Sequence, residues 1–416
     1  MSKKWKVLTI SDHPLVPSGV GLQTRYIIEG LLRTKKYQFR SLGGAIQHND
    51  YRPQKLQEYE DDWVILPVNG YGNEQLLRQI LDSEDFDALW FMTDPRFYTW
   101  LFNMSDEIRD RGIPLLYYHV WDNYPVPQYN RGYYKSCDFI GCISKLTHNI
   151  VSDLDMKDNS AYIPHAVDSD TFRQYSPSKI KKLKGEYLPK HKDKFIVFYN
   201  SRNARRKMTS DVLKIFKQFV DKVGSDKAFL LMHTDPHDKE GANLLAVAKL
   251  LGLTDDQIAF SKERISSEKM ADLYNIADVT MNISNNEGFG LSCLESLSCG
   301  TLVIVNKTGG LQDQPVDNKG NIFGVCVEPS TTTLTGSQQI PYIFDDRCSD
   351  EDLLNAVLKI YKMSQKEKRN LGEQARAWTK EAFSLEGMVT SWDEALSEYI
   401  TKFQNGYPDR IKVVNI

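Results

Sequence analysis

Short apolar runs alternate with longer amphipathic segments along most of the chain. The apolar runs predict buried strands, and apolar residues spaced three or four positions apart predict helices. The expected strands are residues 5–10, 88–92, 115–120, 139–143 and 161–163 in the first half, and 195–199, 228–233, 258–260, 279–283, 301–305 and 325–327 in the second. Helices are expected at residues 22–32, 212–223 and 267–276. Strands that alternate with helices are typical of parallel βαβ sheets, so we expect an α/β protein.

The two groups of predicted strands are separated by a lysine-rich stretch with prolines near both ends, SPSKIKKLKGEYLPKHKDK (176–194). A chain of 416 residues is long for one core, so we expect two doubly wound, Rossmann-like domains that face each other across a cleft. The expected parts are a first domain (1–180), a linker (181–194), a second domain (195–382) and a final helical segment (383–416). The lysine-rich stretch is either a solvated helix and linker or a basic rim for an anionic acceptor.

Composition narrows the class of protein. The net charge of −3 provides no global basic field for nucleic acid, and no apolar run approaches the ~18 residues that span a bilayer. The six cysteines contain no CxxC pair, which favours a reducing compartment, so we expect a cytoplasmic protein. His233 and His237 flank a proline and have no third ligand nearby in the sequence, so we expect no metal site.

The strongest chemical signal is NNEGFGLSCLESLSCGTLVIVNKTGG (285–310), where Glu287 and Glu295 flank a Gly-Phe-Gly turn between a predicted strand and a helix. Backbone amides of residues 288–291 at a helix N-terminus suit phosphate or sugar oxygens. Glu295 is suited to accept two hydrogen bonds from a vicinal diol such as ribose, and Glu287 is suited to hold sugar hydroxyls. Each acid alone would be an ordinary surface residue, but the pair around this turn indicates a site.

Three weaker signals also follow predicted strands. NSRNARRKM (200–208) places several cations after strand 195–199, which favours a diphosphate site over a basic surface turn. PSGVG (17–21) lies between the first predicted strand and helix 22–32. It is either a glycine turn that contacts a ligand or only a tight connection between the strand and the helix. His119 ends strand 115–120, so we expect it to point at the cleft, although a structural role for a single histidine stays open.

These motifs resemble those of the large group of retaining GT-B glycosyltransferases known as family 4 or group 1. EGFGLSCLE (287–295) is similar to the family's E-x7-E motif, and SCGTLVIVNKTGG (298–310) is similar to its continuation. AYIPHAVDSDTF (161–172) and DLYNIADV (272–279) also resemble family segments. The resemblance extends over nearly the whole chain, loosely in the first domain, and implies the GT-B fold.

The resemblance implies a role for each matching residue. Glu295 would hold the donor ribose, Glu287 the donor sugar, Arg202 and Lys207 the diphosphate, Gly19 the phosphate or anomeric region, and His119 the transferred sugar. Catalytic roles are therefore expected for His119, Glu287, Arg202 and Lys207. Donor binding is expected for Gly19, Arg202, Arg206, Lys207, Glu287, Gly288, Phe289, Gly290, Leu291 and Glu295.

The chain departs from the family pattern at several positions. Ser201 and Met208 stand where the family has glycine, and His165 where it has asparagine. The spacing also leaves open whether Arg206 or Lys207 is the diphosphate cation. Residues 329–342, PSTTTLTGSQQIPY, look inserted and have no transferable role, so we expect a surface insertion there.

The implied function is metal-independent transfer of a hexose or pentose from a nucleotide sugar, most readily a UDP-sugar, to an acceptor hydroxyl with retention. No cofactor is expected, and the first domain would take the acceptor. The acceptor could be a glycan, a lipid carrier, a protein, a small molecule or a modified DNA base. Basic residues in the linker and at 200–208 are compatible with contact to DNA, and the basic helix 22–36 is compatible with contact to an anionic membrane. The alternatives are a sugar-nucleotide epimerase, a phosphorylase, and a binding protein that transfers nothing. The oligomeric state is left open.

Overall fold

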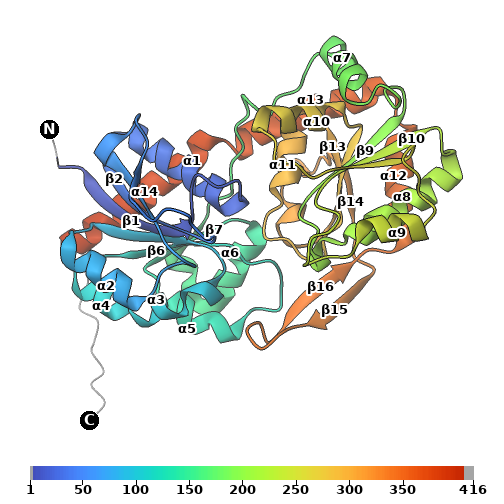
Figure 1. Ribbon diagram of the computed structural model, residues 1–416. Coiled ribbons are helices and arrows are strands. Elements are labelled where there is room, and N and C mark those ends of the chain that lie inside the picture. Colours follow the sequence, from blue (N-terminus) through green and yellow to red (C-terminus); the bar gives the residue numbers. More distant parts are fainter. Residues whose placement is uncertain (1–2, 407–416) are drawn as a thin grey trace.

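The computed structural model describes residues 3–406 and shows two α/β domains beside each other (Figure 1). The first domain holds an eight-stranded sheet in the order β3-β4-β2-β1-β5-β6-β7-β8, parallel except for β3. Its strands are β1 (Trp5–Asp12), β2 (Tyr37–Gly44), β3 (Gln54–Lys55), β4 (Trp63–Pro67), β5 (Ala88–Met92), β6 (Leu115–His119), β7 (Phe139–Cys142) and β8 (Ser160–Tyr162). Its helices are α1 (Gly19–Arg33), α2 (Glu74–Ser83), α3 (Thr99–Asn103), α4 (Ser105–Asp110), α5 (Arg131–Lys135) and α6 (Lys145–Val151).

The second domain holds a six-stranded parallel sheet in the order β11-β10-β9-β12-β13-β14. Its strands are β9 (Phe195–Asn200), β10 (Ala228–His233), β11 (Ile258–Ser261), β12 (Val279–Asn282), β13 (Leu302–Asn306) and β14 (Gly324–Val327). Its helices are α8 (Thr209–Val223), α9 (Leu244–Leu250), α10 (Ser267–Ile276), α11 (Leu291–Ser298), α12 (Asp350–Lys362) and α13 (Gln365–Ala382). Each sheet is buried between helices, which explains why its strands read as continuous apolar runs.

The first sheet has strands that the apolar pattern did not predict, β2, β3 and β4. In β2 the apolar run is broken by Arg40 and Ser41, which have partners elsewhere in the fold. The Ser41 hydroxyl, which is buried, accepts hydrogen bonds from Thr9 (2.7 Å) and from Trp63 Nε1 (3.0 Å), and Arg40 lies 3.0 Å from Glu84. Because these partners come from distant segments, the sequence pattern could not show that the polar residues belong to a strand.

Two helices lie between or across the domains. Helix α7 (Pro177–Tyr187) falls in the lysine-rich stretch and packs against α10. The last helix, α14 (Leu385–Gln404), leaves the second domain and packs along α1 (Figure 1). Its Trp392 is fully buried, with its ring 5.6 Å from that of Trp90 and 5.1 Å from that of Tyr118. Residues 407–416 of the predicted final segment lie outside the described residues.

The segment that looked inserted (329–342) forms the first strand and the turn of an antiparallel hairpin, in which β15 (Thr331–Thr335) pairs with β16 (Ile343–Arg347). It projects from the second domain toward α5 of the first (Figure 1, orange).

No helix within residues 3–406 is both long and apolar enough to cross a membrane.

Candidate functional site

The glycine turn between β12 and α11 is where the two domains meet. A Cβ atom on Gly288 would lie 3.1 Å from Asp122 Oδ1, in the loop after β6. A Cβ atom on Gly309 would lie 2.1 Å from the Glu287 carbonyl oxygen and 2.6 Å from that of Asp122. Gly19, at the start of α1, similarly faces the Leu291 side chain. Turns at the carboxyl ends of both sheets therefore come into contact, which is where open α/β sheets bind ligands.

Glu287 lies at the centre of this junction and is paired with two cations. Its carboxylate forms an ion pair with Lys207 Nζ and lies 3.7 Å from Arg206 Nη1. The Glu287 and Lys207 side chains are only 12% and 11% exposed. Burial raises the pKa of Glu287, but Lys207 and Arg206 outweigh this effect and hold its pKa below the ordinary value. Glu287 is therefore a charged group in a largely dry site.

Glu295, one turn into α11, lies in a different environment. Tyr274 donates a hydrogen bond of 2.8 Å to Glu295 Oε2, and Asn200 in turn donates to the Tyr274 hydroxyl at 2.8 Å. Burial raises the pKa of Glu295 to about 7, and the hydrogen bond from Tyr274 only partly opposes that rise. The two carboxylates of the motif are thus held at different pKa values by their surroundings.

The cations of the loop after β9 do not all point the same way. Residues Arg205–Lys207 form a single helical turn that ends at Met208, in a left-handed conformation (φ 53°). Arg206 donates a 2.9 Å hydrogen bond to the Asn286 carbonyl and lies 3.6 Å from Asp122 Oδ2. Arg202, by contrast, is 64% exposed and paired with Asp238 at 2.7 Å. The structure therefore brings Arg206, not Arg202, together with Lys207 at the glycine turn.

His119 ends β6 as expected but has no solvent exposure. Its Nε2 is hydrogen-bonded to the Tyr134 hydroxyl at 2.7 Å, and its ring lies parallel to that of Trp121. Burial lowers the pKa of His119 to about 3, so the imidazole is neutral at physiological pH. The expectation that it points at the cleft is not supported by this packing, although its buried Nδ1 has no hydrogen-bond partner among the described residues.

The loop after β6 contributes a carboxylate that the sequence analysis missed, Asp122. It lies against Gly288 and faces Arg206, and burial raises its pKa while Arg206 opposes that rise. One feature of the sequence could have identified it: WDN (121–123) comes directly after the predicted strand 115–120. Residues at the carboxyl ends of parallel strands commonly bind ligands.

The β15–β16 hairpin ties both domains together beside this site. Asp346 accepts hydrogen bonds from Asn123 of the first domain and from Thr308 of the second, both at 2.7 Å. The Phe344 amide donates to the Tyr124 carbonyl at 2.6 Å, and the Tyr129 hydroxyl donates to the Tyr342 carbonyl at 3.0 Å. The expected surface insertion (329–342) is therefore part of a hairpin that bridges the domains, with Tyr342 as one of the contacts.

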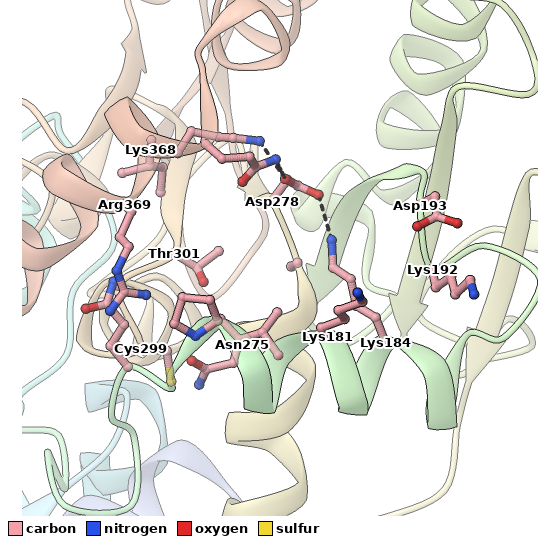
Figure 2. A pocket seen from close by; sticks show the side chains of 17 residues that line it. Lys181, Lys184, Lys192, Asp193, Asn275, Asp278, Cys299, Thr301, Lys368 and Arg369 are labelled. Carbon is pink, nitrogen blue, oxygen red and sulfur yellow. Dashed lines mark hydrogen bonds and ion pairs between the residues drawn. The ribbon is translucent and has the colours of Figure 1, made fainter.

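A separate cavity of about 360 Å³ lies at the opposite end of the second sheet, between α7 and α13 (Figure 2). Asp278, just before β12, lies between two lysines, 3.2 Å from Lys184 of α7 and 2.5 Å from Lys368 of α13. Figure 2 shows both lysines directed at this carboxylate. The pair between Lys184 and Asp278 holds α7 against the domain, so this lysine of the lysine-rich stretch is structural. Within residues 3–406, no three His, Cys, Asp or Glu side chains are grouped as metal ligands would be.

Comparisons with known proteins bear on the family and the fold. Residues 180–335 match the family described as "Glycosyl transferases group 1", which confirms the resemblance seen in the motifs. The chain is similar to N-acetyl-alpha-D-glucosaminyl L-malate synthase of Bacillus anthracis, with 27% identity over 235 residues, 56% of this chain and 53% of that protein. The match thus spans about half the length of that relative.

Solved structures show the fold. A glycosyltransferase from Rickettsia africae superposes with a TM-score of 0.70 at 17% identity, covering 96% of this chain and 99% of the other. HepE from Anabaena, solved in complex with UDP and glucose, superposes with a TM-score of 0.67 at 16% identity, covering 95% and 100%. The expected GT-B architecture of two Rossmann-like domains is confirmed.

Proposed function

Because its second domain matches the group 1 glycosyl transferases and the whole chain has the GT-B fold, we propose that this protein is a glycosyltransferase. It moves a sugar from a nucleotide donor to an acceptor hydroxyl. The observation that carries the proposal is the joint position of Glu287, Lys207 and Arg206 at the glycine turn that begins α11. The site thus combines a sugar-binding acid, two diphosphate-binding cations and a helix N-terminus.

In the proposed reaction, the bond between the anomeric carbon and the diphosphate oxygen breaks, and negative charge develops on the leaving diphosphate. Arg206, Lys207 and the amides of residues 288–291 stabilise that charge, an effect worth ~3–4 kcal/mol for one well-placed donor. Arg206 takes the role first expected of Arg202, which is held by Asp238. Two cations at the diphosphate are also the reason to expect no metal requirement.

We further propose that the reaction proceeds with retention. The acceptor oxygen attacks the anomeric carbon from the face that the diphosphate leaves, and its proton passes to the leaving phosphate oxygen. Glu287 is a poor candidate for a covalent nucleophile, because its carboxylate is already paired with Lys207 and Arg206. It is better suited to hold the hydroxyls of the donor sugar, next to Gly288.

The donor is proposed to be a UDP-sugar, bound with its ribose diol on Glu295. HepE, solved with UDP and glucose, supports this choice of base. The acceptor would approach from the first domain. A cytoplasmic location is also proposed, and it is supported by the free cysteines, most of which are buried.

The first test is a thermal-shift comparison of UDP, CDP, GDP and ADP in the presence of EDTA. We expect UDP to raise the Tm of the wild type. The Glu295→Gln variant should lose most of that Tm increase, because the amide is a weaker hydrogen-bond acceptor for the ribose diol. Glu381→Gln, at an exposed position on α13, is the matched control and should respond as the wild type does. No shift with any nucleotide, or an equal shift in the Glu295 variant, would contradict the donor site.

The raised pKa of Glu295 predicts a pH dependence of donor affinity. With a pKa of about 7, Glu295 is largely protonated at pH 6, and a protonated acid accepts hydrogen bonds poorly. The Kd of UDP-glucose should therefore rise about tenfold for each pH unit below 7 and level off above pH 7. UDP-glucose is chosen because its diphosphate lacks the terminal phosphate ionisation near neutral pH. Calorimetric titration should show a flat profile for Glu295→Gln; the same slope in that variant would assign the titration to another group.

A further inference from the structure

Large apolar side chains are exposed on the loops that follow the strands of the first domain. Leu15 follows β1, Ile46 and Tyr51 follow β2, and Phe97 follows β5. Tyr51 and Phe97 are 50% and 48% exposed. These loops lie at the carboxyl end of the sheet, the end that meets the second domain at Gly19 and Asp122. Exposed apolar residues gathered at such an edge are typical of a binding surface.

The aromatic residues of these loops form two groups of neighbouring rings, which the loop after β4 joins. The ring of Phe97 lies 5.1 Å from that of Tyr71, in the loop after β4. The Tyr51 hydroxyl donates a 2.6 Å hydrogen bond to Asn69 of the same loop, and the Tyr51 ring lies 5.7 Å from that of His48. Four separate loops therefore contribute to one feature, which we call the aromatic arc (His13, His48, Tyr51, Tyr71 and Phe97). His13 is buried next to His48, and the other four rings are partly or largely exposed.

A cavity of about 570 Å³ opens beside His48 and Tyr51 of the arc. It is lined by residues 45–49, Tyr51, Asn69 and Gly70, and these lining residues include no aspartate, glutamate, lysine or arginine. Neutral amides at Gln47, Asn49 and Asn69 provide donors and acceptors beside the aromatic rings. The two arginines next to the arc are matched by acids, Arg52 with Asp50 at 2.6 Å and Arg96 with Asp94 at 2.9 Å.

The part of the arc that contains Tyr71 and Phe97 is connected to the donor site. The Tyr71 hydroxyl donates to Asp12 at 2.8 Å, and Asp12 accepts from Ser18, the residue that precedes Gly19 and its contact with Leu291 of α11. In the same part of the arc, Arg96 lies beside Phe97 and interacts electrostatically with Asp122. A molecule lying on the arc therefore extends toward the glycine turn where transfer is proposed.

On this basis we propose that the acceptor is an uncharged oligosaccharide whose sugar rings stack along the aromatic arc. The inference rests on the proposed function and deepens it by naming the acceptor class. A sugar ring has an apolar C–H face and a rim of hydroxyls, which suits exposed aromatic rings beside neutral amides. A phosphorylated acceptor or a nucleic acid would need unpaired cations for its phosphates, and the lining of this cavity provides none.

The test is binding of the full chain, with UDP present, to an array of neutral oligosaccharides. Wild-type protein should bind at least one glycan, and the double variant Tyr51→Ala, Phe97→Ala should bind it at least tenfold more weakly. Tyr187→Ala, which removes an exposed tyrosine from α7, is the matched control and should bind as the wild type does. Circular dichroism and the UDP thermal shift should be the same in all three proteins.

Several outcomes would overturn the inference. These are absence of glycan binding by the wild type, equal binding by the double variant, or binding only of inositol phosphate or of a single-stranded DNA oligomer used as a probe. The UDP shift separates the two proposals. If UDP shifts the Tm but no glycan binds, the acceptor class is wrong and the donor site stands. If UDP itself has no effect, the proposed function fails.

Discussion

Lys207→Met is expected to lower the rate of sugar transfer by at least ~10²-fold, because it removes one of the two cations at the leaving diphosphate. The same change leaves the Glu287 carboxylate without its closest partner in a largely buried position. Breaking one side of a buried ion pair costs about 3–5 kcal/mol of folding stability. Both effects can be measured on one preparation, as donor turnover and as the urea midpoint of unfolding.

A second substitution separates the two effects. Glu287→Gln added to Lys207→Met removes the unpaired charge, so the double variant should regain much of the lost stability. It should not regain activity, because both proposed donor-binding groups are then missing. Lys217→Met, which removes a surface pair with Asp221, is the matched control and should change neither measurement appreciably. Normal turnover in folded Lys207→Met protein would rule out the assigned role.

Gly309→Ala is expected to disrupt the contact between the two domains at the candidate site. Gly309 has φ +52°, and an added Cβ atom would lie 2.1 Å from the Glu287 carbonyl and 2.6 Å from the Asp122 carbonyl. Backbone oxygens cannot move aside as a flexible side chain can, so the loop after β6 and the glycine turn must separate. We expect a loss of several kcal/mol in stability and loss of the UDP thermal shift.

Gly320→Ala is a matched control for the backbone conformation. Gly320 has φ +82°, but nothing lies within 4 Å of an added Cβ atom. It should therefore lose only the roughly 1–2 kcal/mol that a left-handed residue other than glycine costs, and keep UDP binding. If the two variants behaved alike, the close contact between the domains at Gly309 would be unimportant for the site.

The local sequence was sufficient for the two-domain α/β fold and for the core of the motif. Helix and strand periods are local properties, and buried parallel strands read as apolar runs. Glu287, the glycines at 288 and 290, and Glu295 lie within one strand–turn–helix unit, so their spacing alone placed them at a helix N-terminus. Nothing distant in the chain had to be known for that inference.

The sequence could not show which cations join the motif or what the insertion does. Arg202 and Arg206 are four residues apart in one loop, and only Asp238, distant in sequence, shows that Arg202 is held away. Strand β2 was missed because the partners of its polar residues come from other strands. Residues 329–342 looked like a surface loop because the hairpin obtains its order from Asn123, Tyr124 and Tyr129 of the other domain.

The fold class, the glycine turn and the two acids around it could be inferred from the sequence, since each depends on neighbours within a few residues along the chain. Four features came from the folded structure: Arg206 faces the turn, Asp122 lies against Gly288, His119 is buried, and four loops contribute to one aromatic arc. Charge pairing, burial and ring contacts act between segments far apart in sequence, and these segments come together when the chain folds.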